Sequence, residues 1–178
     1  GTCLVGSEMC IRDRMKDILA LTQQAVKPLE TLNTKAINNL RELVTLDNKV
    51  SSSLIETHQS AAHGVAWLAT YTESIRQMVK WGEKVSEQNK FGQTEQLLLQ
   101  IAVSEYLGQI LGGIMMSQGE IFRLNDIGLT TLDLSEFQTQ AVKDLIQNGN
   151  NQHARALLVD IMLELSLIHI SEPTRQVP

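Results

Sequence analysis

Apolar residues recur every three or four positions through most of this 178-residue chain. This is the spacing of the buried face of a helix. The pattern predicts five helices, over residues 17–46, 54–88, 95–114, 136–147 and from 152 onward. Almost no stretch shows the strict alternation of a half-buried strand. We therefore predict an all-α fold, a bundle of about five helices with a long second helix and a buried central third helix.

The first two helices contain clear breaking, turn and capping signals. Pro28 lies inside the first helix and should kink or split it, because proline lacks a backbone N–H and crowds the preceding turn. Residues 47–49 (DNK) indicate the turn that follows. A serine of the run 51–53 then caps the second helix.

The second helix carries two apolar stripes, so it should have two packing partners. One stripe is formed by Leu54, His58, Ala61, Val65, Leu68, Ile75 and Val79. The other is largely aromatic and is formed by Trp67, Tyr71, Met78, Trp81 and Val85. The simpler interpretation is that both stripes pack inside the bundle. The alternative is that the aromatic stripe docks on another part of a larger protein.

The third helix is apolar nearly all round, which is typical of a central helix. We expect Val103, Leu107 and Ile110 to be almost inaccessible to solvent. Gly108 should lie against another helix, so that replacing it with leucine would overpack the contact. Residues 115–134 are rich in glycine and weakly periodic, which indicates irregular structure with one short helical turn. Ser135 should cap the fourth helix, and Gly149 should end it in a left-handed conformation.

The two ends of the chain resemble translated sequencing adapter. Residues 4–13 (LVGSEMCIRD) and 165–175 (LSLIHISEPTR) are encoded by the two strands of one short DNA element, similar to the transposon end used in shotgun libraries. We therefore expect residues 1–14 and 165–178 not to be native and not to join the fold. The natural part is then a single helical domain over residues 15–164, a fragment of a longer protein.

Composition narrows the class of protein. Both cysteines, Cys3 and Cys10, lie in the first tail, so no disulfide framework or thiolate metal site is expected. The net charge is −5 and no basic run occurs, which argues against a nucleic-acid partner. No stretch approaches the roughly 18 apolar residues of a membrane span. Met15 is expected to be a natural start without a signal peptide, which favours a cytoplasmic protein with no membrane partner.

Residues with catalytic potential are scattered. His58 and His63 are five positions apart and do not share a helix face as two metal ligands four apart would. Glu73, Glu105 and Glu120 are isolated carboxylates, and no Glu-x-x-His motif of a bundle metal site occurs. We therefore predict no catalytic, cofactor-binding or metal-binding residue in this chain.

Two stretches carry a family resemblance. HQSAAHGVAWLATYTESIRQMVKWGEK (58–84) and FGQTEQLLLQIAVSEYLGQILGGIMMSQGEIFRLNDIGL (91–129) resemble the amino-terminal helical extension of methylsuccinyl-CoA dehydrogenase-type acyl-CoA dehydrogenases. The resemblance implies a parent protein that uses FAD to oxidise a branched acyl-CoA to the enoyl-CoA. It also implies that the flavin site, the acyl-CoA pocket and the catalytic glutamate follow Glu164. None of these can be assigned to residues of this chain.

The resemblance favours a non-catalytic accessory domain that packs on its own catalytic core or joins subunits of a homo-oligomer. We predict that such a domain interface uses the aromatic stripe and the 115–123 segment. Its candidate residues are Trp67, Tyr71, Met78, Trp81, Ser117, Gln118, Glu120 and Arg123. The alternative is a free-standing helical interaction protein, such as a phasin-like coat of storage granules. The apolar third helix argues against it, because a coating helix should keep one broad polar face.

Overall fold

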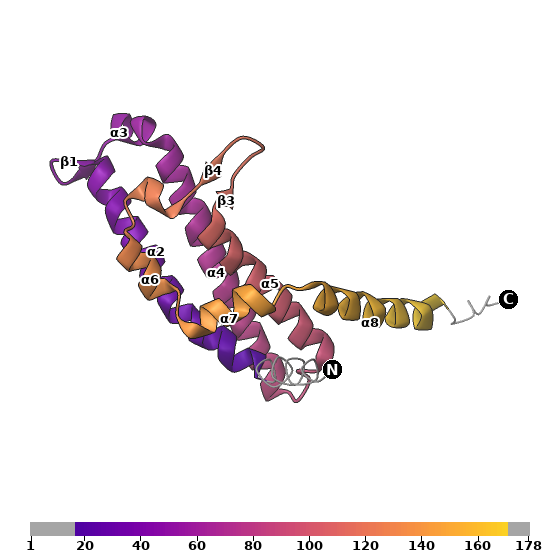
Figure 1. Cartoon of the computed structure of the whole chain (residues 1–178). Coiled ribbons are helices and arrows are strands. Elements are labelled where there is room, and N and C mark those ends of the chain that lie inside the picture. Colours follow the sequence, from indigo (N-terminus) through magenta and orange to yellow (C-terminus); the bar gives the residue numbers. More distant parts are fainter. Residues whose placement is uncertain (1–16, 171–178) are drawn as a thin grey trace, which may run out of the picture.

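The computed structural model describes the backbone of residues 17–170 and the side chains of residues 17–165. Within this part, seven α-helices, one 3-10 helix and two small antiparallel hairpins follow one another along the chain (Figure 1). The predicted all-α class is confirmed. The first expected tail, residues 1–14, and residues 171–178 of the second, expected over residues 165–178, lie outside the described residues.

The first long helix, α2 (Ile18–Val44), begins at Asp17, whose carboxylate accepts the N–H of Ala20 at 3.0 Å. The helix continues through Pro28 as one element, so of the predicted kink or split the split is wrong. Proline removes the hydrogen bond to the carbonyl four residues earlier. That carbonyl belongs to Gln24, which is exposed, so water can satisfy it.

The expected turn after the first helix is confirmed as a tight hairpin. Strands β1 (Thr45–Leu46) and β2 (Lys49–Val50) pair antiparallel. Asp47 and Asn48 between them both have positive φ, at 50° and 60°. This geometry is that of a two-residue type I′ turn, in which Asp and Asn are among the preferred residues.

The predicted second helix is interrupted near its start. It forms α3 (Ser52–Thr57), capped by Ser51, and α4 (Gln59–Glu87). The break is at His58, which has φ −106° and ψ 30°. Its N–H still donates to the carbonyl of Leu54 and its carbonyl still accepts from Ala62, so the chain bends there without losing its hydrogen bonds.

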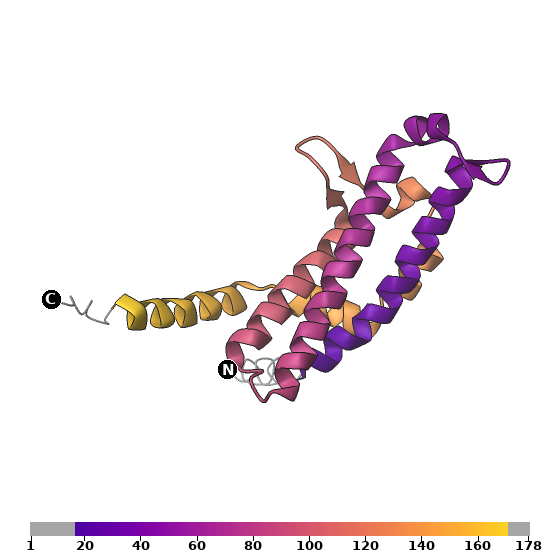
Figure 2. The same cartoon turned by 180° about the vertical axis from the view of Figure 1, so that it is seen from behind.

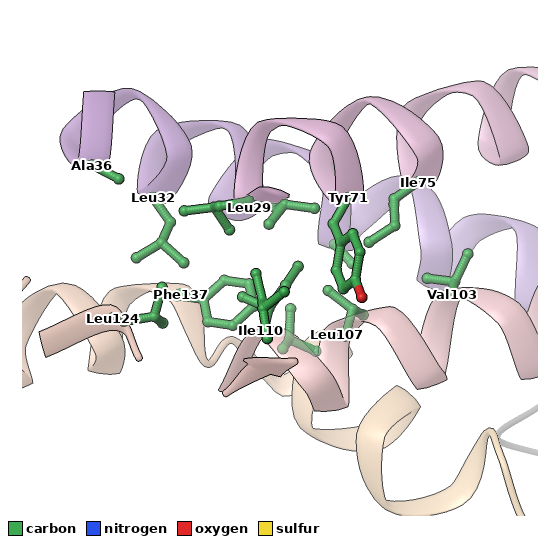
Figure 3. Packing of buried hydrophobic residues seen from close by; sticks show 14 of the residues in the cluster. Leu29, Leu32, Ala36, Tyr71, Ile75, Val103, Leu107, Ile110, Leu124 and Phe137 are labelled. Carbon is green, nitrogen blue, oxygen red and sulfur yellow. The ribbon is translucent and has the colours of Figure 1, made fainter. Parts of the chain in front are cut away.

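The core lies between α2, α4 and α5 (Gln93–Gly112), which run side by side (Figures 1 and 2). The apolar stripes predicted for these helices supply most of it. Figure 3 shows how side chains from all three helices converge with those of the later elements. The fully buried members include Leu29, Leu32, Leu68, Ile75, Leu107, Ile110 and Phe137.

The third long helix is central, as predicted: α5 contacts α2, α4, α7 and α8. Val103, Leu107 and Ile110 are buried, which confirms the expectation for these three. The expectation for Gly108 is wrong, because a Cβ built there meets no atom within 4 Å. The close approach is made by Gly149, where a Cβ would lie 1.7 Å from Oγ of Ser104.

The open space beside Gly108 changes the expected effect of a substitution. Glycine inside a helix is less favourable than alanine because of its backbone entropy. We expect Gly108→Ala to raise the free energy of unfolding by about 0.5–1 kcal/mol. Urea denaturation of both proteins would measure the change. A clear loss of stability would show that another backbone does approach Gly108.

The segment between the long helices and α7 is more ordered than the sequence indicated. It starts with a second hairpin, β3 (Ile114–Met115) and β4 (Ile121–Phe122), where irregular structure was expected. The predicted short helical turn is present as the 3-10 helix η1 (Leu124–Ile127). The predicted fourth helix divides into α6 (Thr131–Phe137) and α7 (Gln140–Asn148).

The helix caps in this region also differ from the prediction. Ser135 lies inside α6 and caps nothing; Thr130 caps α6 and accepts the N–H of Asp133. Thr139 caps α7 and accepts the N–H of Val142. Gly149 ends α7 with φ −75°, which is right-handed, so the predicted left-handed cap is wrong.

Helix α6 is tied to α2 through an ion cluster at the surface. Nζ of Lys35 lies 2.6 Å from a carboxylate oxygen of Asp133 and 2.7 Å from one of Glu136. These hydrogen bonds raise the pKa of Lys35. The hydrogen bond from Lys35, followed by those from Thr130, holds the pKa of Asp133 well below its ordinary value.

The lowered pKa of Asp133 has a consequence for acid stability. A carboxyl with a depressed folded pKa contributes stability above its unfolded pKa, near about 3.9, and loses it as the pH falls towards the folded pKa. We expect Asp133→Asn to be less stable than the parent at neutral pH, with the gap closing below about pH 4. Thermal melts between neutral and acidic pH would show it. A gap independent of pH would mean that the ion cluster contributes nothing.

The last helix, α8 (Gln152–Ile170), projects away from the bundle (Figures 1 and 2). Residues 165–170, the start of the second predicted tail, continue this helix by backbone. Ala154 is buried at its start, whereas residues 162–165 are exposed.

Candidate domain interface

The structure separates the residues of the predicted aromatic stripe. Tyr71 is buried in the core, and Trp67 and Met78 are partly buried against it. Trp81 is exposed near the other end of α4. Tyr71 therefore packs within the bundle, as the simpler interpretation of the stripe has it. Of the four candidate interface residues on α4, Trp81 offers the most exposed surface.

Tyr71 anchors a chain of hydrogen bonds that leads to the surface. Its ring centroid lies 4.6 Å from that of Tyr106, and its hydroxyl donates to Oε1 of Gln109 at 2.8 Å. The amide of Gln109 donates in turn to Glu105 at 2.8 Å. Burial, and then the nearby Tyr106 and Glu105, raise the pKa of the Tyr71 hydroxyl. The phenol therefore stays neutral and serves as a donor.

The same chain continues onto the start of α8. Asn150 donates its amide to the second oxygen of Glu105, and Nε of Arg155 donates to Oδ1 of Asn150 at 2.5 Å. Glu105 thus accepts from two amides. The polar side chains between α5 and α8 are largely satisfied by one another.

The β3–β4 hairpin is fastened to α4 through Glu120, the residue before β4. Ser60 donates to a carboxylate oxygen of Glu120 at 3.0 Å, and Nδ1 of His63 lies 3.9 Å from the other oxygen. Nε1 of Trp67 donates to Nε2 of His63 at 3.0 Å. In this arrangement Nε2 is the acceptor, so a neutral His63 carries its proton on Nδ1, facing Glu120.

The base of the hairpin is fastened by packing. Phe122 is buried and its ring lies over Gly64 of α4, where a Cβ would be only 2.0 Å from Cδ2 of the ring. Ser117 and Gln118 are exposed at the tip, and Arg123 is exposed after β4. The structure therefore brings Trp67 and Glu120 together through His63, and leaves Ser117, Gln118 and Arg123 at the surface.

Two open hollows lie on the surface of the described residues. The larger, of about 520 Å³, is a groove between α5 and the start of α8. It is lined by Ile101, Ala102, Glu105, Tyr106, Gln109, Asn150 and Arg155. The smaller, of about 270 Å³, lies between α2 and α6 around Lys27, Lys35 and Phe137. Lys35 is already engaged there by two carboxylates.

The described residues contain no group of three or more His, Cys, Asp or Glu side chains placed to hold a metal ion. In the same part of the chain, no helix is long and apolar enough to cross a membrane. What the arrangement offers is surface for packing: a hairpin, an open groove and a projecting helix.

Comparison with known proteins finds a similar enzyme. Over most of this chain's length, the sequence is similar to an acyl-CoA dehydrogenase, as the two quoted stretches indicated. The particular relative is (2S)-methylsuccinyl-CoA dehydrogenase of Cereibacter sphaeroides, with 48% identity over 146 residues. The aligned part is 82% of this chain and 26% of that enzyme, so the chain spans about a quarter of the relative's length. No family model matches the chain.

Sequence reasoning missed several residues of this region. The polar chain through Asn150 and Arg155 depends on contacts between α5 and α8, which are distant in the sequence. Phe122 had a local signal, since Ile114–Met115 and Ile121–Phe122 are two short apolar pairs on either side of Ser-Gln-Gly. Such pairs around a glycine-containing turn indicate a hairpin.

Proposed function

We propose that this chain is a non-catalytic helical accessory domain of an FAD-dependent acyl-CoA dehydrogenase. The observation that supports it most is the 48% identity to (2S)-methylsuccinyl-CoA dehydrogenase over 146 residues. The parent enzyme would bind FAD and dehydrogenate a short branched acyl-CoA. The residues that perform this chemistry would lie in the three quarters of the enzyme outside the aligned part.

The side chains of the described residues support a non-catalytic role. The titratable groups with shifted pKa values have structural partners: Lys35 and Asp133 hold α6 on α2, and Tyr71 lies in the core. Glu73, whose pKa is lowered, accepts hydrogen bonds from Gln77 and Arg76 along α4. The domain's partners would be its own catalytic core and, in a homo-oligomer, neighbouring subunits. A phasin-like coat protein has no support from the comparison.

An exchange experiment tests the proposal. In the enzyme from Cereibacter sphaeroides, the aligned segment would be replaced by the 146 matching residues of this chain. We expect this chimera to bind FAD and to oxidise (2S)-methylsuccinyl-CoA, because a domain of the same class should dock in the same place. The unmodified enzyme and a variant lacking the segment are the controls. A folded, flavin-loaded chimera without dehydrogenase activity would contradict the proposal.

A further inference from the structure

Helix α5 leaves part of its apolar surface uncovered. Leu98 is 43% exposed, and Ile101 and Ala102 are only half-buried. The polar strip of the helix points elsewhere: Gln100 donates to the carbonyl at the end of α7 at 2.8 Å, and Ser104 is buried. On this side, therefore, apolar residues lie at the surface beside Glu105 and Gln109, whereas Gln100 and Ser104 of the same helix face inward.

Helix α8 also carries uncovered apolar side chains. Its exposed side chains include Val159 at 52%, Met162 at 57% and Leu163 at 56%. The groove lined by Ile101, Ala102, Tyr106 and Arg155 joins it to α5. We call these residues, with Leu98, the α5–α8 face. Exposed large apolar side chains gathered on neighbouring elements are typical of a surface that binds a partner.

We propose that the α5–α8 face is the surface on which the remainder of the acyl-CoA dehydrogenase chain docks. This inference rests on the proposed function. The occupant follows from length: about three quarters of the similar enzyme lies outside the aligned part, and a body of that size is available to cover the face. Helix α8, which projects from the bundle, would lie between the two bodies (Figure 1).

The polar side chains of the groove already form hydrogen bonds with one another. Glu105 accepts from Gln109 and Asn150, and Asn150 accepts from Arg155. Because these groups already have partners, covering them leaves few polar atoms unsatisfied. Apolar side chains around a satisfied polar strip are the composition of the core of a domain interface. The terminal N–H groups of Arg155 favour a carboxylate or carbonyl on the docking body.

Hydroxyl-radical footprinting of the chimera tests the inference. The labelling rate of each side chain is divided by its rate in the same protein unfolded. Leu132 on α6, 68% exposed, is the control for a free surface, and Trp81 reports the alternative face on α4. We expect Met162 and Val159 to be protected at least about fivefold relative to Leu132. Labelling of both at the rate of Leu132 in an active chimera would overturn the inference and leave the proposed function standing.

Two further outcomes decide the occupant. Protection of Met162 that appears only as the chimera concentration rises would identify a second copy as the occupant and overturn the proposal. Protection of Trp81 without protection of Met162 would move the docking surface to α4 and also overturn it. A chimera that folds, binds FAD and fails to dehydrogenate its substrate would instead count against the proposed function.

Paired substitutions give an independent readout. Met162→Glu would bury a charge at the interface, so it should lower the melting temperature of the chimera. Leu132→Glu adds the same charge at a free surface and should leave it nearly unchanged, as should the conservative Met162→Leu. Equal effects of the two glutamates would contradict docking at α8.

Discussion

The Phe122→Ala variant will lose about 3–5 kcal/mol of unfolding free energy, the usual effect of deleting a buried phenylalanine. Phe122 is 3% exposed and belongs to the cluster of buried residues shared by the long helices. Its ring occupies the space left by the missing side chain of Gly64. Removing it would leave a cavity between the hairpin and α4 and release the base of the hairpin.

A second substitution isolates this contact. Gly64→Ala should also destabilise, by about 1–3 kcal/mol, because its methyl group would overlap the ring. In the double variant the new methyl group fills part of the cavity, so the combined loss should be smaller than the sum of the two single losses. Met115→Ala, at an exposed position of β3, is the control and should change stability by less than about 0.5 kcal/mol. Additive effects of Gly64→Ala and Phe122→Ala in urea denaturation would contradict the contact.

The second large effect is expected at the junction of α7 and α8. Gly149→Ala should lower the free energy of unfolding by about 1–3 kcal/mol, because its Cβ would lie 1.7 Å from Oγ of Ser104. The right-handed backbone of Gly149 would accept alanine, so the strain comes from the contacts of the added methyl group, the shortest of them with Ser104. Thermal or urea unfolding would measure it.

Ser104 provides the matched test of that strain. Its Oγ is buried and has no hydrogen-bond partner among the described residues. Ser104→Ala removes this atom and should be nearly neutral alone, since no hydrogen bond is lost. In the Gly149→Ala background it should recover part of the lost stability. If Ser104→Ala gives no recovery, the clash lies elsewhere, for example with the carbonyl of Leu145, 2.7 Å from the same Cβ position.

The two glycines show what the sequence could and could not predict. The sequence predicts a close approach of another helix at Gly108 of α5. The close approach is real but occurs at Ser104, and the glycine that permits it is Gly149, on the partner segment. Helical periodicity defines the face of one helix. It does not show which residue of another helix will meet that face.

The core was predictable for a related reason. The helix is apolar nearly all round, so any element packed against it buries apolar side chains. Val103, Leu107 and Ile110 are buried for this reason. The caps were harder to predict, because several Ser and Thr residues compete in the same short segment. Thr130 rather than Ser135 caps the helix, because the carboxylate of Asp133 accepts the backbone N–H of Thr130 at 2.8 Å. The reciprocal pair stabilises that start of the helix.

The interface is harder to predict than the core, because the residues that would cover it belong to the part of the enzyme outside the aligned segment. The aromatic stripe contains surface and core residues together, since Trp81 is exposed and Tyr71 is buried. The sequence does not predict the α5–α8 face as an interface, although it shows that α5 is apolar nearly all round. Leu98 and its apolar neighbours would become buried only if another part of the protein covers them.

The visible absorption spectrum tests the central claim most directly. This chain and the full-length protein that contains it would be purified, refolded with excess FAD and freed of unbound flavin. We predict that the chain alone is colourless, whereas the full-length protein retains the flavin absorption band and loses it on reduction by a short branched acyl-CoA. A chain that keeps bound flavin on its own, or a folded full-length protein that binds none, would contradict the account.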